Sequence, residues 1–414
     1  MSRIISPAAL LLVFWVHAAP ARADAVVDWN RLAAATYEAD YNAHPETRLS
    51  SAWSPKLETI PIVAVAIFQA VNTASPRYTP FRAALAGSHE AASGLAAAAA
   101  AGHAALVKIF PERKEALDDA YALSLAKIPD SPARSAGIAL GERAAAQVIA
   151  WRTADNAATA PPYRPYAIAG KWVPSTPMAI APWRWSAKPW LLESSTQFRP
   201  QAPPGLASAT WARDFNETRT LGAKDSAVRS PEWTALAKFY MQWRLEPIVQ
   251  QVASRPGRTL EQNARLYAMV AMVVVDAGFA EADGKLYFSF WRPITAIRNG
   301  DQSGNHATQR DATWEPLLPN PVQPEYPCGH CNMITALTTV LSAEGPPPTG
   351  GIEITSDALP GVVHTVPSFE VLADEISMSR IYAGAHFRTS VEAGVALGRS
   401  VANFGLRGFL KPLE

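Results

Sequence analysis

KLYFSFWRP at residues 285–293 is the stretch that decides both the fold and the site. It follows a helical pattern that begins at Thr259 and passes Asp276, and it ends in a proline, which disrupts a helix. Lys285 and Arg292 are seven residues apart. If the stretch is helical, they share one face two turns apart, and both can reach one anion. A Lys–Arg pair is usually solvated, but these two lie among aromatic residues, where charges need a partner or an anion.

PCGH at residues 327–330 is the second segment whose residues could bind a ligand or take part in catalysis. Its proline and glycine precede an apolar helical pattern, which we expect from about Cys331 to Ala343. Backbone N–H groups at the start of that helix would point at a bound anion. His330 is then placed to act as an acid or a base, whereas a capping or core histidine is the alternative interpretation.

SR at residues 379–380, followed by His386, is the third segment. A neutral imidazole can attack phosphorus or bind a metal when a partner holds its other nitrogen. Ser390 lies four residues after His386 and shares its face if the helix continues, so it is the candidate partner. The alternative is that Ser379 and Ser390 only cap or decorate these helices.

The two cysteines of the chain, Cys328 and Cys331, lie within the second segment. Their CGHC sequence resembles the redox site of protein disulfide isomerases. Such a site follows a strand in a βαβ pattern, whereas this one follows a proline-rich loop in helical sequence. We therefore favour a local structural disulfide, with disulfide exchange as the alternative.

The N-terminal residues 1–23 have the layout of a cleaved secretory signal: Arg3, an apolar run over 8–16, and small residues before Asp24. That run is far shorter than the ~20 residues of a spanning helix, and we expect no later membrane span. The mature protein is expected to begin near Asp24, to be soluble, and to be secreted or periplasmic. The balance of 37 Lys+Arg against 36 Asp+Glu argues against nucleic-acid binding.

Four regions follow from composition: the signal peptide 1–23, an N-terminal helical region 24–155, a Pro/Trp-rich strap 156–225, and a C-terminal helical region 226–414 that carries the site. The tryptophans of the strap favour packing over the helices rather than a disordered linker. Helical patterns are expected at residues 61–72, 90–110, 112–128, 131–152, 231–255, 259 towards 285, 331–343, 368–383 and 389–404.

The three segments, taken in order, resemble the signature shared by vanadium haloperoxidases and type 2 phosphatidic acid phosphatases: Lys-x6-Arg-Pro, Pro-Ser-Gly-His and Ser-Arg-x5-His. The similarity extends over nearly the whole mature chain. Other segments that resemble exported bacterial haloperoxidase-like proteins start at Tyr78, Gly137, Gln197, Phe215, Phe290 and Pro324.

This resemblance implies an all-α fold of packed helical bundles. It implies that the equatorial oxygens of vanadate or phosphate are held by Lys285, Arg292, Gly329 and Arg380. His330 would be the acid–base residue, and His386 would be the axial vanadium ligand or a phosphorylated nucleophile. The leading function is a vanadate-dependent haloperoxidase that oxidises halide with hydrogen peroxide. The alternatives are a phosphatase that cleaves phosphate esters without a metal cofactor, and a catalytically weak oxyanion-binding homologue.

The chain departs from the signature at two positions. Cys328 stands in the oxyanion cradle where the family usually has serine, and a thiol donates hydrogen bonds poorly. Ser390 stands where the haloperoxidases usually have aspartate, four residues after the histidine. Glu392 is the nearby carboxylate that is the candidate to compensate for this serine.

Overall fold

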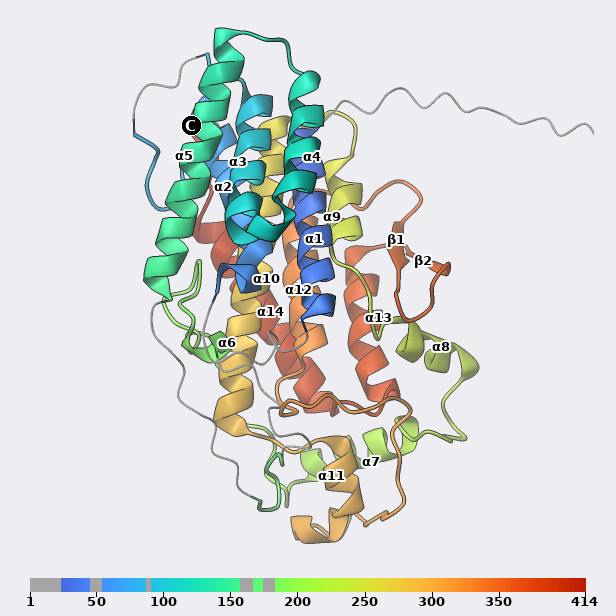
Figure 1. Ribbon diagram of the computed structural model, residues 1–414. Coiled ribbons are helices and arrows are strands. Elements are labelled where there is room, and N and C mark those ends of the chain that lie inside the picture. The colour runs from blue at the N-terminus through green and yellow to red at the C-terminus, as the bar shows by residue number, and fades with distance from the viewer. Residues whose placement is uncertain (1–23, 45–53, 87–90, 157–166, 174–182) are drawn as a thin grey trace, which may run out of the picture.

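The computed structural model describes residues 24–44, 54–86, 91–156, 167–173 and 183–414. The predicted signal peptide lies outside the described residues, as do residues 157–166 and 174–182 of the strap. Two neighbouring groups of helices form most of the protein, and the small hairpin of β1 and β2 lies at one side (Figure 1). The all-α fold class expected from the sequence is confirmed.

The first group of helices comes from the N-terminal region, where small residues allow close packing. Helix α3 packs against α2 and α5, and a run of buried alanines from 96 to 101 forms its contact surface. The bounds are α1 Ala25–Ala43, α2 Thr59–Ala74, α3 Gly94–Ile109, α4 Lys114–Ala126 and α5 Pro132–Asp155, with 3-10 turns η2 Pro55–Glu58 and η3 Pro111–Arg113.

The second group packs along the long helix α10, Leu260–Phe288, and extends beyond its lower end (Figure 1). The capping box expected at Thr259 and Gln262 is confirmed. The other bounds are α6 Trp183–Ser186, α7 Ala209–Leu221, α8 Pro231–Phe239, α9 Glu246–Ala253, α11 Pro293–Arg298, η4 Gly300–Ser303, α12 Gly329–Ala343, α13 Phe369–Tyr382 and α14 Arg388–Gly408. Strands β1, Ile352–Thr355, and β2, Val363–Val366, pair antiparallel.

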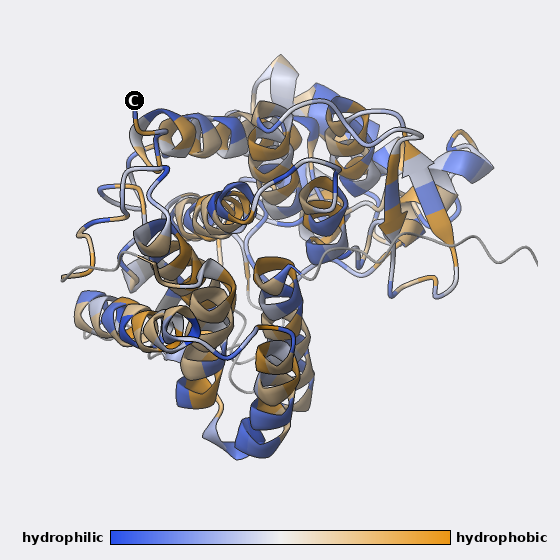
Figure 2. Ribbon diagram, turned by 90° about the horizontal axis from the view of Figure 1, so that it is seen from above, coloured by the Kyte–Doolittle hydropathy of each residue, from blue (hydrophilic) through white to orange (hydrophobic). Residues whose placement is uncertain are grey.

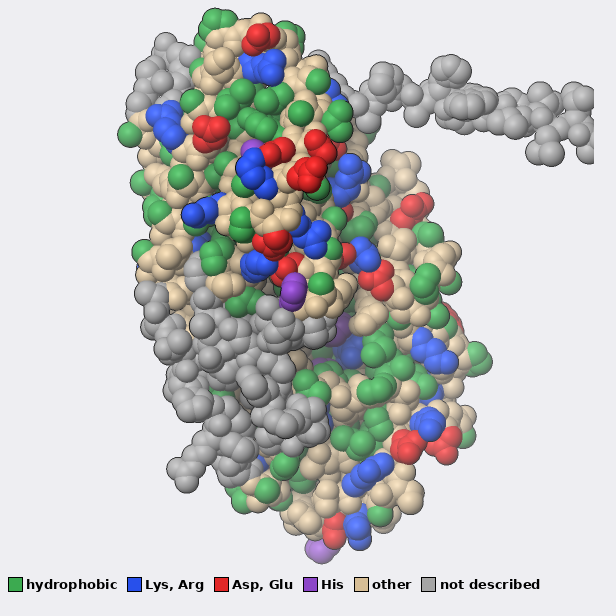
Figure 3. Space-filling model, in the orientation of Figure 1, with side chains coloured by type: hydrophobic (Ala, Val, Ile, Leu, Met, Phe, Trp, Pro, Cys, Tyr) green, Lys and Arg blue, Asp and Glu red, His purple; other side chains and the backbone are tan. Residues whose placement is uncertain are grey.

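Helix α10 joins the two groups because it packs against α2 on one side and against α12 and α14 on the other. One apolar core therefore runs continuously from α1 to α14. Seen from above, the helices lie side by side and turn apolar faces towards one another (Figure 2). On the outer face in Figure 3, acidic and basic side chains are interspersed, in keeping with the net charge of +1.

The helix expected over residues 231–255 is wrong in one respect, because it is broken into α8 and α9. The carbonyls of Phe239 and Gln242 at the break accept hydrogen bonds from the Ser356 hydroxyl at 2.5 and 3.1 Å, so a distant loop satisfies the end of α8. Pro247 lies in the first turn of α9, where a proline is tolerated.

The stretch Pro55–Ala74 is, among the described residues, long and apolar enough to cross a membrane, and 78% of its tested window is buried inside the protein. Helices α3 and α4 pass the same test only if they are counted as one span, although they are bent by 118°. Burial of this kind is typical of a core helix.

Within the strap, the packing expected of the tryptophans is confirmed for Trp172 and Trp190, which are both buried. The strap also contains helix α7, which its proline-rich composition does not indicate. This helix becomes important for the site, because Trp211 on it is fully buried.

Candidate active site

The three chemistry-bearing segments meet at the lower ends of α10, α12 and α13. Lys285, Arg292, Arg380 and His386 are only 7%, 4%, 4% and 2% exposed. Arg292 Nη1 lies 3.1 Å from His386 Nε2, which joins the first segment to the third. The convergence expected from sequence is thus found in space for these residues.

The expectation that Arg292 shares a helix face with Lys285 is wrong. Helix α10 ends at Phe288, and Ser289 follows it in the left-handed region, with φ of 46°. The next residues are extended: Ser289 O accepts a hydrogen bond from Trp172 N at 2.7 Å, and Phe290 O accepts one from Glu325 N at 2.9 Å. Arg292 therefore reaches the site from extended backbone before Pro293, as expected of a residue that precedes proline.

An aromatic cluster holds the backbone of this region. Its centre is Trp211, whose ring lies 4.9 Å from that of Phe387 and 6.0 Å from that of Trp291. Trp291, Tyr326 and Phe387 are chain neighbours of Arg292, Glu325 and His386, so rigid rings flank each of these groups. The cluster consists of Trp211, Phe215, Phe290, Trp291, Ala296, Ile297, Trp314, Tyr326 and Phe387.

Lys285 directs its ammonium group at the loop that precedes α12. Its Nζ donates to the carbonyl oxygens of Pro324 at 2.8 Å, Glu325 at 3.1 Å and Pro327 at 2.7 Å. An ammonium group has three N–H donors, so these bonds engage all of them. Burial lowers the pKa of Lys285 to about 8, and Glu281, at 3.7 Å, opposes that shift. Lys285 holds the loop in shape, and its direct contact with an oxyanion stays a prediction.

Arg380 differs from Lys285 because part of its guanidinium has no partner. Its Nε and Nη1 are buried and make no hydrogen bond among the residues that the structure describes. Burial lowers the pKa of Arg380 and of Arg292 to about 10 in each case. Unpaired N–H groups of a buried cation are costly, and an oxyanion satisfies both the charge and the donors.

Arg292 is anchored and still faces His386. Its Nε donates to Gln323 O at 2.7 Å, and its Nη1 donates to Ala385 O at 2.9 Å. A guanidinium has no acceptor, so Nε2 of His386 must accept the 3.1 Å contact from Nη1. Burial lowers the pKa of His386 well below its usual value, and the charge of Arg292 adds to this effect. The imidazole is therefore neutral, with its lone pair on Nε2.

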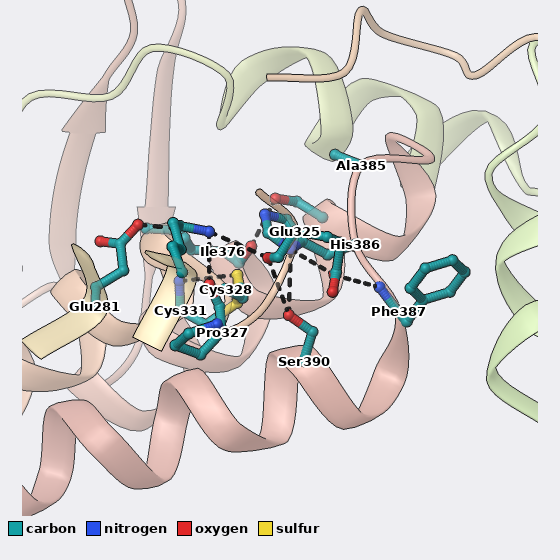
Figure 4. The surroundings of a disulfide bond; sticks show 12 residues. Glu281, Glu325, Pro327, Cys328, Cys331, Ile376, Ala385, His386, Phe387 and Ser390 are labelled. Carbon is teal, nitrogen blue, oxygen red and sulfur yellow. Dashed lines mark hydrogen bonds and ion pairs between the residues drawn. A yellow bond between two sulfur atoms is a disulfide. The ribbon is translucent and has the colours of Figure 1, made fainter. Parts of the chain in front are cut away.

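His386 lies between α13 and α14, so the continuous helix considered from the sequence does not form. Its contact with Ser390 is nevertheless present, with Ser390 Oγ 3.3 Å from Nδ1. A shorter contact of 2.8 Å joins Nδ1 to Oε1 of Glu325. Figure 4 shows Glu325, Phe387 and Ser390 gathered around His386 beside the disulfide.

Glu325 is the site residue that the sequence analysis did not single out. It is fully buried, and its only sequence signal is its place just before the PCGH segment. Burial raises its pKa to about 7, while the charge of Arg292 opposes that rise. Glu392, the expected compensating carboxylate, is exposed, so that expectation is wrong.

The start of α12 carries the disulfide. Cys328 and Cys331 are bonded, as the sequence analysis favoured, and both are fully buried. Cys328 Sγ accepts a hydrogen bond from Cys331 N at 3.3 Å and so caps the helix. The disulfide leaves Cys328 without a hydrogen to donate to an anion. Its burial within packed helices also disfavours exchange with external thiols.

Gly329 and His330 form the first turn of α12. A Cβ on Gly329 would lie 2.3 Å from Oε1 of Glu281, so a side chain at this position would displace that carboxylate. His330 is half-buried. Burial lowers its pKa well below the usual value, and a hydrogen bond with the Met241 backbone opposes that shift. Met241 comes from the break between α8 and α9, which places this break beside the site.

Comparison with known proteins supports the same superfamily. Residues 265–411 match the family model described as the VCPO second helical-bundle domain. This match covers most of the C-terminal region, including all three segments of the candidate site. No curated protein matches the chain.

Solved structures extend this likeness to most of the chain. A bacterial vanadium-dependent iodoperoxidase has a TM-score of 0.74 at 22% identity, covering 94% of this chain and 97% of its own. A bacterial vanadium-dependent chloroperoxidase in its apo form has a TM-score of 0.66 at 17% identity, covering 84% and 92%. Its holo form gives 0.63 at 17%, covering 84% and 89%. The chain thus has the vanadium haloperoxidase fold from its N-terminal helices onward.

Proposed function

We propose that this protein is a vanadate-dependent haloperoxidase that uses hydrogen peroxide to oxidise a halide. The observation that carries this proposal is the buried guanidinium of Arg380, which lies close to His386 and has N–H groups without a partner in the described part of the chain. A tetrahedral oxyanion fits both features, because it accepts hydrogen bonds and its central atom accepts a lone pair.

Each residue of the site has a role that follows from the chemistry of its side chain. Arg292 and Arg380 would donate to the oxygens of vanadate, and His386 would bind vanadium through Nε2. When bound, vanadate supplies a Lewis-acidic centre that activates peroxide towards halide. His330 is half-buried and neutral, so it can accept a proton from an incoming peroxide. The buried aromatic cluster would exclude water from the backbone that carries Arg292 and His386.

The compartment is a second part of the proposal. We propose that residues 1–23 direct export, so that the protein acts in the periplasm or outside the cell. The disulfide between Cys328 and Cys331 supports this view, because such bonds persist mainly in oxidising compartments.

The test combines binding and turnover. Calorimetry on the purified protein should show one vanadate per chain, with phosphate competing, because both present a tetrahedral oxyanion to the same cations. The loaded protein should then oxidise iodide, bromide or chloride only when peroxide is present. Independent binding of the two anions, or release of phosphate from esters without any halide oxidation, would contradict the proposal and favour the phosphatase alternative.

A further inference from the structure

We propose that Glu325 is the positioning residue for His386 and supplies the carboxylate that Ser390 lacks. The vanadate measurements below rest on the proposed function, whereas the spectroscopic measurement does not. The inference begins from two contacts of one oxygen: Glu325 Oε1 lies 2.8 Å from His386 Nδ1 and accepts from Phe387 N at 3.0 Å. Two neighbouring donors on one loop therefore converge on a single carboxylate oxygen (Figure 4).

The backbone of Glu325 is also fixed. Its N–H donates to Phe290 O at 2.9 Å, and its carbonyl accepts from Lys285 Nζ at 3.1 Å. The side chain is fully buried. Glu325 thus connects the end of the first segment, the lysine of α10 and the loop of His386, and its carboxylate has little freedom to turn away.

The geometry assigns the proton of the imidazole. Arg292 can only donate to Nε2, so Nε2 carries no hydrogen, and the hydrogen of a neutral ring is on Nδ1. Nδ1–H then donates to Glu325. This orientation leaves the Nε2 lone pair on the side of the two arginines, where a ligand to vanadium is needed.

Ser390 does not perform this role. Its Oγ is 3.3 Å from Nδ1, longer than the Glu325 contact, and its hydroxyl donates to the carbonyl of Glu325 at 3.4 Å. The hydroxyl is neutral and polarises an imidazole less than a carboxylate does. In this chain the carboxylate that faces Nδ1 therefore comes from the loop before the PCGH segment and not from the helix after the histidine.

A double-mutant cycle tests this role of the Glu325 carboxylate through the dissociation constant of vanadate, measured by calorimetry. We expect Glu325→Ala to weaken binding by about 10–100-fold, the usual effect of losing the partner of a ligating histidine. Ser390→Asp alone should also weaken binding, because it buries a second carboxylate beside Glu325. Combined with Glu325→Ala, the same Ser390→Asp change should restore most of the affinity, since space is freed and a carboxylate again faces Nδ1.

The effect of Ser390→Asp on vanadate affinity should change sign between the wild-type and Glu325→Ala backgrounds. This change of sign distinguishes a positioning role of Glu325 from a purely structural one. A double variant that binds vanadate no better than Glu325→Ala would overturn the proposal, because it would mean that the loss comes from the loop and not from the carboxylate. The Phe387 N–H also loses its acceptor in Glu325→Ala, and Glu325→Gln keeps that acceptor. This variant should therefore fold normally and bind vanadate more weakly than wild type.

Nitrogen-15 NMR of the histidine ring tests the proton assignment without vanadate. His386 in the wild-type protein should show a protonated Nδ1 and an unprotonated Nε2. A proton on Nε2 would overturn the proposal even if every variant failed to fold. If the ring shows the expected state but wild type does not bind vanadate, the haloperoxidase function fails and the positioning role of Glu325 stands.

Discussion

Two clusters of buried charge lie along α10, and they differ in whether their charges are satisfied. In the upper cluster, Arg152 is fully buried and donates to both carboxylate oxygens of Glu58, at 3.0 and 2.8 Å. Trp190 Nε1 also donates to Glu58, at 2.7 Å. Beside them, Asp276 of α10 accepts three hydrogen bonds from the backbone N–H groups of residues 190–192.

The lower cluster is the candidate active site. Three cations lie there, and Arg380 has two nitrogens without a partner among the described residues. Burial alone therefore does not identify a functional group, because both clusters are equally buried. The informative difference is that the side chains of the upper cluster satisfy one another, whereas Arg380 in the lower cluster has two N–H donors without a partner among the described residues, beside the Nε2 lone pair of His386, which accepts only from Arg292.

The largest effect is expected at His386. His386→Ala should abolish peroxide-dependent halide oxidation, because it removes the imidazole that would bind vanadium. Turnover of the vanadate-loaded protein and its circular dichroism spectrum measure the two sides of this claim. His306→Ala is the matched control, since His306 is exposed and lies outside the three segments. A folded His386→Ala protein with wild-type rates would refute the assignment.

A substitution in the upper cluster should lower the stability of the protein and leave vanadate binding unchanged. Arg152→Met leaves Glu58 buried without its cation, and breaking such a pair costs about 3–5 kcal/mol in free energy of unfolding. Chemical denaturation measures this loss. The affinity for vanadate should not change in the protein that remains folded, because Arg152 lies outside the site. A marked loss of affinity at preserved stability would remove the distinction between the clusters.

Arg380→Met, in the lower cluster, should weaken vanadate binding without lowering the stability of the protein. The free energy of unfolding should stay the same or rise, because the variant removes an unpartnered buried charge and keeps a similar volume. Vanadate affinity should fall by about 1.5–3 kcal/mol for each charged hydrogen bond lost. Denaturation and calorimetry on the same preparation give both numbers. Destabilisation comparable with that of Arg152→Met would show that Arg380 is a structural cation.

The sequence predicts what depends on local chemistry. The capping box at Thr259 appears as expected, and so do the helix that starts at the PCGH segment and the disulfide within it. The convergence of the three segments could also be predicted, because their order in the sequence resembles a known signature. The capping box, the helix start and the disulfide depend on residues close together in the chain, where spacing carries the information.

The missed features depend on contacts between distant segments. Helix α10 ends at Phe288 because residues 170–172 of the strap and residue 325 pair with the extended backbone that follows. Glu325 meets His386 across 61 positions of sequence, so a search near the histidine finds Glu392 instead. The orientation of Lys285 towards loop carbonyls is likewise invisible in the spacing of the motif.

The smallest effect is expected at the disulfide, because Cys328 lies at the oxyanion site but has no hydrogen to donate to the anion. Cys328→Ser opens the bond and restores a hydroxyl at the start of α12, where one extra hydrogen bond to an oxyanion contributes about 0.5–1.5 kcal/mol. Vanadate affinity should therefore be preserved or rise by up to about tenfold. The loop that the bond closes is short, so its loss should cost no more than about 2 kcal/mol of stability.

Cys331→Ser is the control that separates the two effects, because it also opens the disulfide but leaves a thiol at Cys328. If the hydroxyl is responsible, Cys328→Ser should bind vanadate more tightly than Cys331→Ser, which should match wild type treated with a reductant. Thiol counting before and after reduction confirms the state of each protein, and insulin reduction measures disulfide exchange. Substantial insulin reduction by wild type, lost in Cys328→Ser while vanadate binds to neither, would replace the oxyanion site with a redox site. The upper cluster holds no cysteine, so its contribution to stability should be the same in all three proteins.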